Sequence, residues 1–170
     1  MKVSSVDRMR AMDRSATERY GISEMLLMEN AGMAACTVLD REVGIPGGTF
    51  LVFCGGGNNG GDGFVAARKI HSLGGRARVF LLADQDKYRG SAKENLDIIS
   101  RLPIEVARLN STGSLGHDLA HCDAVVDAML GTGLDREVSG LYAEVIEAVN
   151  ECPQPVLSLD IPSGVNGDTG

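Results

Sequence analysis

Three polar side chains interrupt a glycine-rich stretch in the first half of the chain. Residues 53–64 read FCGGGNNGGDGF, so that Asn58, Asn59 and Asp62 supply all the polarity of a segment that is otherwise mostly glycine. Carboxamide oxygens are ligands for hard cations, and they also form hydrogen bonds with polar small molecules. The stretch therefore predicts a site for a polar ligand, a cation or both.

The same stretch also satisfies the dinucleotide fingerprint Gly55-x-Gly57-x-x-Gly60, which favours a nicotinamide-dependent dehydrogenase. In such enzymes a pyrophosphate lies on the first turn of the following helix, where free N–H groups and the helix dipole favour anions. Asp62 is expected at or next to that turn, where a capping carboxylate would occupy the anion site itself. A phosphate-binding loop of the NTPase type is excluded, since no Lys-Ser or Lys-Thr pair follows the glycines. Of the three functions that we consider for this chain, a dehydrogenase is therefore the least favoured.

Two further acids stand where apolar segments end. Asp127 lies inside the segment DAVVDAML and is followed by Gly-Thr-Gly, and Asp160 follows the segment PVLSL. Asn and Asp are common in turns and helix caps, so each has an ordinary structural explanation. A carboxylate inside an apolar strand, however, is costly unless it is paired or binds a metal. Asp127 therefore needs a partner, and a cation is a good candidate.

The elements that position these residues alternate along the chain between helices and strands. Helices are expected at 6–20, 23–44, 64–73, 91–103, 115–120 and 141–149, where Ser23 can cap the second helix, Gly44 can end it, a capping box begins at Ser91 and Pro103 ends that helix. Strands are expected at 49–54, 76–83, 104–109, 123–130 and 155–161. This order predicts an α/β fold with a mostly parallel sheet covered by helices on both faces. Ligands of such sheets bind at the carboxyl ends of the strands, where the loops 55–63, 131–137 and 161–170 meet.

Composition limits the class of partner. The net charge is −7, aromatic residues make up 4% of the chain and Trp is absent, so a nucleic-acid surface is not expected. No apolar run reaches membrane-spanning length, and the first ten residues lack the apolar core of a secretory signal. The four cysteines include no C-x-x-C pair. We therefore expect a cytoplasmic protein with reduced thiols.

Four motifs follow one another in order along nearly the whole chain: Leu27-Met-Glu-Asn-Ala-Gly32, the loop 55–63, VDAMLGTGL at 126–134 and LDIPSGVNGD at 159–168. Together they resemble the YjeF N-terminal domain family, the NAD(P)HX epimerases. The combination of NNGGDG with DIPSG is highly specific. One departure is Gly56, where family members often carry Pro.

The resemblance implies a three-layer α/β/α Rossmann-like fold and a role in nicotinamide-nucleotide repair. The implied reaction is epimerisation of the R and S forms of hydrated NADH and NADPH (NADHX and NADPHX). The implied potassium ligands are Asn59, Asp127 and Ser163, a set with one formal charge, which suits a large monovalent ion better than magnesium or calcium. The implied substrate-binding residues are Asn58, Asn59, Gly60, Gly61, Asp62, Gly131, Thr132, Gly133, Leu134, Asp135, Arg136, Glu137 and Asp160.

Asp160 is the residue that we expect to act as general acid and base. Moving a hydroxyl between the two faces of the substrate ring requires a proton transfer, whether hydroxide leaves and returns or the ring opens. Asp160 leaves an apolar strand, where desolvation should raise the pKa of its carboxyl, while a nearby cation would lower it. The sequence leaves open which of the two effects is larger.

The organisation expected from the sequence is one YjeF N-terminal domain over residues 1–170. The chain stops inside a Gly- and Asp-rich loop just after a strand, which predicts an apparent truncation at the C-terminal end of the domain. A dehydratase, fused or separate, is an expected partner, and the two amphipathic N-terminal helices favour a homodimer. The alternative function is a non-catalytic dimeric scaffold of the same fold that binds a ligand or RNA.

Overall fold

A parallel five-stranded sheet forms the centre of the protein in the computed structural model, which describes residues 4–134 and 136–170. The strand order is β3-β2-β1-β4-β5, and every neighbouring pair runs parallel. The predicted parallel α/β sheet is therefore confirmed. The strands are β1 (Thr49–Cys54), β2 (Arg76–Leu81), β3 (Glu105–Arg108), β4 (Ala124–Ala128) and β5 (Val156–Ser158).

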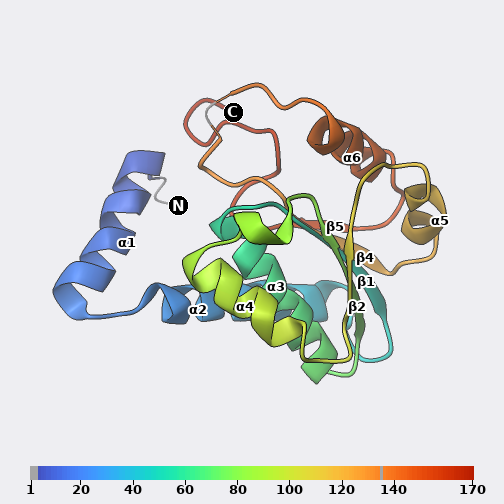
Figure 1. Ribbon diagram of the computed structural model, residues 1–170, viewed down its shortest axis with the longest axis horizontal. Coiled ribbons are helices and arrows are strands. Elements are labelled where there is room, and N and C mark those ends of the chain that lie inside the picture. The colour runs from blue at the N-terminus through green and yellow to red at the C-terminus, as the bar shows by residue number, and fades with distance from the viewer. Residues whose placement is uncertain (1–3, 135) are drawn as a thin grey trace.

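Helices cover both faces of this sheet and give three layers (Figure 1). One core lies between the sheet and α2, α3 and α4, and the other lies between the opposite face and α5 and α6. Alternation along β1 divides its side chains between the two, because Phe50 and Val52 belong to the first core and Leu51 and Phe53 to the second. The helices are α1 (Val6–Tyr20), α2 (Glu24–Glu42), α3 (Asn58–Ser72), α4 (Gly90–Ile99), α5 (Leu115–Ala120) and α6 (Leu141–Asn150), with a 3₁₀ turn η1 (Gln85–Lys87).

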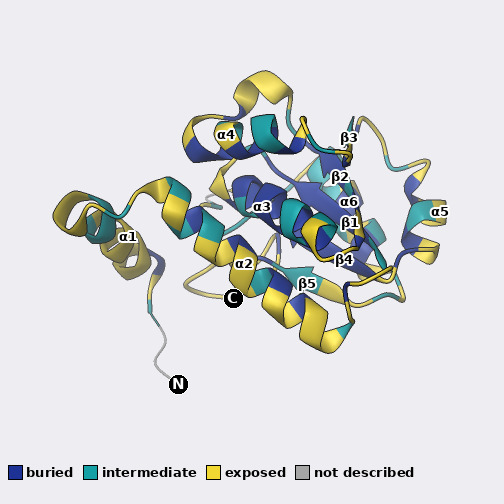
Figure 2. Cartoon of the chain, turned by 90° about the horizontal axis from the view of Figure 1, so that it is seen from below, coloured by how far each residue is buried: buried dark blue, intermediate teal, exposed yellow. Residues whose placement is uncertain are grey.

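The N-terminal helix α1 stands away from the sheet. It ends at Gly21, whose φ of 68° is the left-handed conformation that glycine adopts without strain, and Ser23 then caps α2 by accepting a hydrogen bond from the N–H of Leu26. Val6 is the buried residue of α1, and Figure 2 shows the rest of the helix mainly exposed. In the described residues, no helix combines the length and the apolar character needed to cross a membrane.

The start of α3 differs from the sequence prediction. The helix begins at Asn58 rather than at residue 64, and its N-cap is Gly57, so Asp62 lies inside the helix and does not cap it. The glycines of this stretch allow close packing of a helix: a Cβ on Gly60 would lie 1.9 Å from the carbonyl oxygen of Gly55, and one on Gly63 would lie 2.6 Å from the Cβ of Ala128. Glycines that indicated a loop therefore serve helix packing.

Smaller differences concern other element ends. Helix α4 begins at Gly90 with Arg89 as its N-cap, so the predicted capping box at Ser91 is wrong. Ser91 is the second residue of the helix, and its side chain is buried. Strand β5 is limited to Val156–Ser158, which leaves Asp160 in the loop beyond the strand.

Candidate functional site

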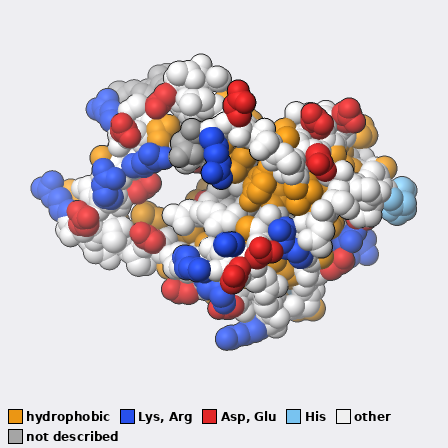
Figure 3. Space-filling view, turned by 45° about the horizontal axis from the view of Figure 1, so that its top comes forward, with side chains coloured by type: hydrophobic (Ala, Val, Ile, Leu, Met, Phe, Trp, Pro, Cys, Tyr) orange, Lys and Arg blue, Asp and Glu red, His pale blue; other side chains and the backbone are white. Residues whose placement is uncertain are grey.

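A cavity of about 1510 Å³ opens at the carboxyl edge of the sheet. Its walls come from α1, α2, the first turn of α3, the loop that follows β4 and the end of β5. Figure 3 shows the hollow, with Lys and Arg side chains along its rim on the side of α1. The cavity thus lies where an open parallel sheet binds its ligands.

The first two turns of α3 present polar groups to this cavity. Asn58, Asn59 and Asp62 line it, and the helix begins without a side-chain cap, so the first N–H groups of the helix are free for an anion or a polar ligand. Both the Oδ1 and the Nδ2 atoms of Asn59 are buried and have no hydrogen-bond partner within the described part of the chain. A buried carboxamide without partners is costly, and a ligand or ion that contacted it would remove that cost.

Asp62 is the acid of α3 that faces the cavity. Burial raises the pKa of its carboxyl to about 7, and the negative charges of Asp160 and Asp13 add to the effect. None of the described side chains or N–H groups donates a hydrogen bond to it. Near neutral pH, Asp62 can therefore exist in both the protonated and the ionised form, as a group that transfers protons must.

Asp160 is fixed by the loop that follows β4. Its Oδ2 atom accepts hydrogen bonds from the backbone N–H of Thr132 at 2.8 Å and from the Thr132 hydroxyl at 3.0 Å. Asp160 has a φ of 63°, the single positive value for a non-glycine residue in the described chain. The loop approaches closely because position 131 is glycine: a Cβ on Gly131 would lie 2.4 Å from Oδ2 of Asp160. Backbone strain of this kind is common at ligand-binding positions.

Asp127 finds its partners inside the protein. The carboxylate is 4% exposed, and it accepts hydrogen bonds from the Ser163 N–H (2.9 Å), the Ser163 hydroxyl (2.5 Å), the Ser158 hydroxyl (3.1 Å) and the Met129 N–H (3.2 Å). Ser163 in turn accepts a hydrogen bond from the N–H of Leu130 at 2.9 Å. These bonds join the ends of β4 and β5 just below the cavity. They supply the partner that the sequence required for Asp127, and they bring it together with Ser163.

Most of the predicted substrate-binding residues meet at the cavity. Gly60 and Gly61 are buried in the packing of α3 and do not line the cavity, and a Cβ on Gly61 would lie 2.5 Å from the Cε atom of Met28. Asp135 falls outside the described residues. The remaining predicted residues line the one cavity: Asn58, Asn59, Asp62, Gly131, Thr132, Gly133, Leu134, Arg136, Glu137 and Asp160.

Other residues support the site without having been predicted from the sequence. The hydroxyl of buried Tyr88 donates a hydrogen bond to the carbonyl of Cys54, just before the glycine-rich stretch. Ser158 bonds Asp127 from the neighbouring strand. Ser158 is the last residue of β5, two positions before Asp160, so the alternation of side chains along the predicted strand 155–161 gave a weak signal for it. For Tyr88, in a connection between two elements, the sequence carries no comparable signal.

Comparison with known proteins identifies a family. A family model described as YjeF-related protein N-terminus matches residues 24–170. The whole chain is 45% identical to a part, 33% by length, of a bifunctional NAD(P)H-hydrate repair enzyme Nnr from Thermofilum pendens. It is also 37% identical, over 96% of its length, to 66% of an NAD(P)H-hydrate epimerase from Rhodopirellula baltica. The chain therefore spans about a third of the bifunctional relative and about two thirds of the epimerase.

A solved structure has the same fold. The yeast protein ynu0 (YNL200c) superimposes with a TM-score of 0.88 over 100% of this chain and 74% of its own, at 24% sequence identity. The three-layer architecture is thus found in a protein of quite different sequence. With the family model covering residues 24–170, the chain belongs to the family of YjeF-related protein N-termini.

Proposed function

We propose that this protein interconverts the R and S epimers of hydrated NADH and NADPH. The observation that carries the proposal is the convergence of Asp62, Thr132 and Asp160 on one cavity at the carboxyl edge of the sheet. The relatives named NAD(P)H-hydrate epimerase support it, since the chain matches them over nearly its whole length. A cavity of about 1510 Å³ also exceeds the roughly 300–1,000 Å³ typical of drug-sized ligands and suits a dinucleotide.

The two carboxyl groups divide the proton transfers between them in this proposal. Asp62, with a pKa of about 7, gives a proton to the hydroxyl on the hydrated carbon, which then leaves as water. The lone pair of the ring nitrogen stabilises the cation that remains. Water adds to the opposite face of the ring and gives a proton to Asp160, which Thr132 holds in position. Proton exchange with the solvent then removes this proton from Asp160 and returns one to Asp62, which restores the protein for the next turnover. Asp160 thus keeps the catalytic role expected from the sequence, and Asp62 becomes its partner.

Potassium is the cation that we propose for Asn59, Asp127 and Ser163. The buried, unpartnered Oδ1 atom of Asn59 fits a cation, and Asp127 with Ser163 adds one charge and a hydroxyl. One charge among neutral oxygens favours a monovalent ion, because magnesium and calcium usually take more carboxylates. A bound ion would supply electrostatic support to the first turn of α3.

Potassium, but not lithium or magnesium, should raise the melting temperature of the ion-stripped protein, and Asp127→Asn should abolish that increase.

We also propose a cytoplasmic homodimer that works together with a dehydratase. Exposed apolar side chains of α1 and α2, among them Met12, Leu26 and Met33, provide surface for a second copy. Bifunctional relatives carry the name of a repair enzyme, which supports cooperation with a second activity. Light scattering on the purified chain tests the dimer: a monomer mass at micromolar concentration would contradict it.

The test of the function uses a mixture of the two hydrate epimers and a dehydratase that consumes only one of them. With the protein present, we expect complete consumption, faster than spontaneous epimerisation allows. Consumption that stops at the fraction of the reactive epimer would contradict the proposal. If the protein bound the hydrate but gave no turnover, the scaffold alternative would replace it.

A further inference from the structure

Arginine side chains from α1 form part of the cavity wall. Arg10 and Arg14 line it from α1, and Arg136 lines it from the loop after β4. They are the only cationic lining residues in the described part of the chain, and the other charged lining residues are acids: Asp13, Glu18, Glu24, Asp62, Glu137 and Asp160. The whole protein carries a net charge of −7. An anionic ligand in this acidic cavity can therefore form ion pairs only with these arginines among the described lining residues.

Arg10 connects α1 with the loop that holds Asp160. Its Nη2 atom donates a hydrogen bond to the carbonyl of Thr132 at 3.2 Å, and Thr132 is the residue that fixes Asp160. The beginning of α1 is held as well, because the N–H of Val6 donates to Oδ1 of Asp168 at 3.0 Å. Helix α1 is thus tied to the two loops that carry the proposed catalytic chemistry.

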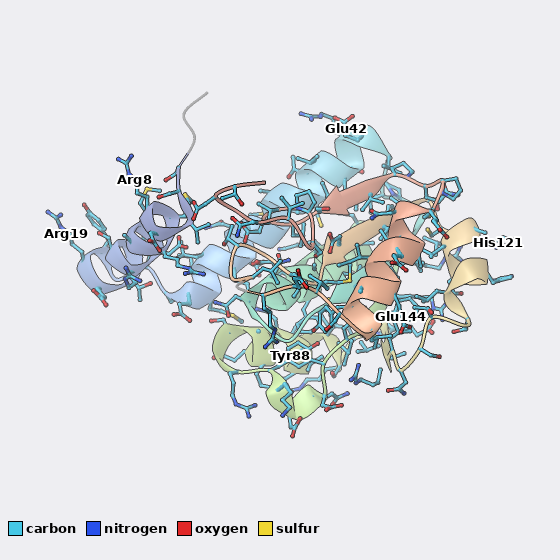
Figure 4. All side chains as sticks on the ribbon, turned by 90° about the horizontal axis from the view of Figure 1, so that it is seen from above. Arg8, Arg19, Glu42, Tyr88, His121 and Glu144 are labelled. Carbon is cyan, nitrogen blue, oxygen red and sulfur yellow. The ribbon has the colours of Figure 1, made fainter. Side chains whose placement is uncertain are left out.

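Arg14 follows Arg10 by one helical turn, which places both on one face of α1. Arg14 forms no ion pair with any described residue, so its guanidinium is available to a ligand. Arg8 and Arg19 of the same helix do not line the cavity, and they point away from the body of the protein (Figure 4). The basic residues of α1 are therefore divided between a cavity face and a solvent face.

We propose that Arg10 and Arg14 bind phosphoryl groups of the dinucleotide, so that α1 forms one wall of the substrate site. This inference rests on the proposed function, because it takes hydrated NADH or NADPH as the ligand. A diphosphate or a 2′-phosphate carries charge that must be offset in an acidic cavity, and the planar guanidinium binds phosphate oxygens in pairs. Helix α1 lies outside residues 24–170, which the family model matches.

The experiment compares Arg14→Ala and Arg10→Ala with Arg8→Ala and Arg19→Ala, which remove the same charge from the other face of α1. Dissociation constants for purified NADHX and NADPHX are measured by calorimetry at constant potassium. We expect each cavity-face variant to bind about tenfold more weakly, as for a lost charge-assisted hydrogen bond. The solvent-face variants should stay within about twofold of the wild type, and added sodium chloride should weaken the wild type more than Arg14→Ala.

The two substrates distinguish the two sources of phosphate. Equal losses for NADHX and NADPHX would assign the arginines to the diphosphate, whereas a loss confined to NADPHX would assign them to the 2′-phosphate. Circular dichroism and melting curves check that each variant retains its fold. Arg14→Lys keeps the charge but not the planar geometry, so it should recover only part of the affinity.

Binding and turnover separate a failure of this inference from a failure of the proposed function. If Arg10→Ala and Arg14→Ala bound both hydrates as tightly as Arg8→Ala does, the role of α1 would be wrong while epimerisation stood. If the wild type bound the hydrates through these arginines but did not epimerise them, the phosphate site would stand and the enzymatic function would fall. A wild type that bound neither hydrate would overturn both.

Discussion

Replacing Asp62 by Asn should stabilise the ligand-free protein at alkaline pH. The pKa of Asp62 rises from an ordinary value of 3.8 to about 7 on folding, mainly because of burial. A folded-state pKa above the unfolded value means that ionisation opposes folding: the cost is absent below pH 3.8, grows as the pH rises, and is complete above about pH 7. At 1.36 kcal/mol for each tenfold change in the proton-binding constant, the full cost is about 4 kcal/mol.

Water in the cavity reduces this value, since Asp62 is only half-buried, and we expect a gain of about 2 kcal/mol for Asp62→Asn at pH 8. Urea unfolding at pH 4, 6 and 8 measures it. The stability difference between the variant and the wild type should be near zero at pH 4 and grow with pH. Asp86→Asn, at an exposed position, is the matched control and should show no such growth. A difference for Asp62→Asn that did not depend on pH would refute the argument.

Three further substitutions test the packing of the site. Gly60→Ala puts a methyl group 1.9 Å from a backbone oxygen and should cost about 3 kcal/mol or more in urea unfolding, whereas Gly57→Ala meets open space and should be tolerated. Ser163→Ala removes a hydroxyl from the buried carboxylate network and should lower stability by about 1–3 kcal/mol, measured by the same method. Gly131→Ala brings a Cβ within 2.4 Å of Asp160, so it should reduce epimerisation at least tenfold while circular dichroism stays unchanged. Unchanged turnover in Gly131→Ala would contradict the importance of that close approach.

The sequence predicted the sheet well because its strands are apolar runs between strong turn signals. The bounds of β1 agree with the prediction at both ends, and the acid inside the run 123–130 falls, as expected, near the carboxyl end of β4. The resemblance grouped Asp127 with Ser163, and the sheet explains why they meet, because Asp127 lies near the carboxyl end of β4 and Ser163 follows the neighbouring parallel strand β5. Their direct hydrogen bond agrees with that expectation.

The first turn of α3 could not be predicted from local propensity. Glycine disfavours helices, so three glycines within six residues indicated a loop. Tertiary packing reverses that preference. A Cβ atom at position 60 would lie 1.9 Å from the carbonyl oxygen of Gly55, so only glycine allows the helix to pack this closely. The pKa of Asp62 depends in the same way on groups distant in sequence, Asp160 and Asp13.

The position of α1 beside the cavity could also not be predicted from the sequence. The pattern of α1 indicated an amphipathic helix, but its direction is set by the left-handed turn at Gly21 together with the hydrogen bonds from Val6 to Asp168 and from Arg10 to Thr132. That direction decides which arginines face the cavity. Arg10 reaches Thr132, 122 positions further along the chain, and no local signal indicates such a contact.

The most direct test of the proposed epimerisation begins with one purified epimer. The R form of hydrated NADPH is incubated with the protein in potassium buffer, and chromatography follows the appearance of the S form, with the reverse experiment begun from S. The account predicts that both directions reach the same mixture, much faster than without protein, and that Asp160→Ala slows both directions equally. Interconversion at the spontaneous rate in both directions, by a folded protein that binds the hydrate, would contradict it.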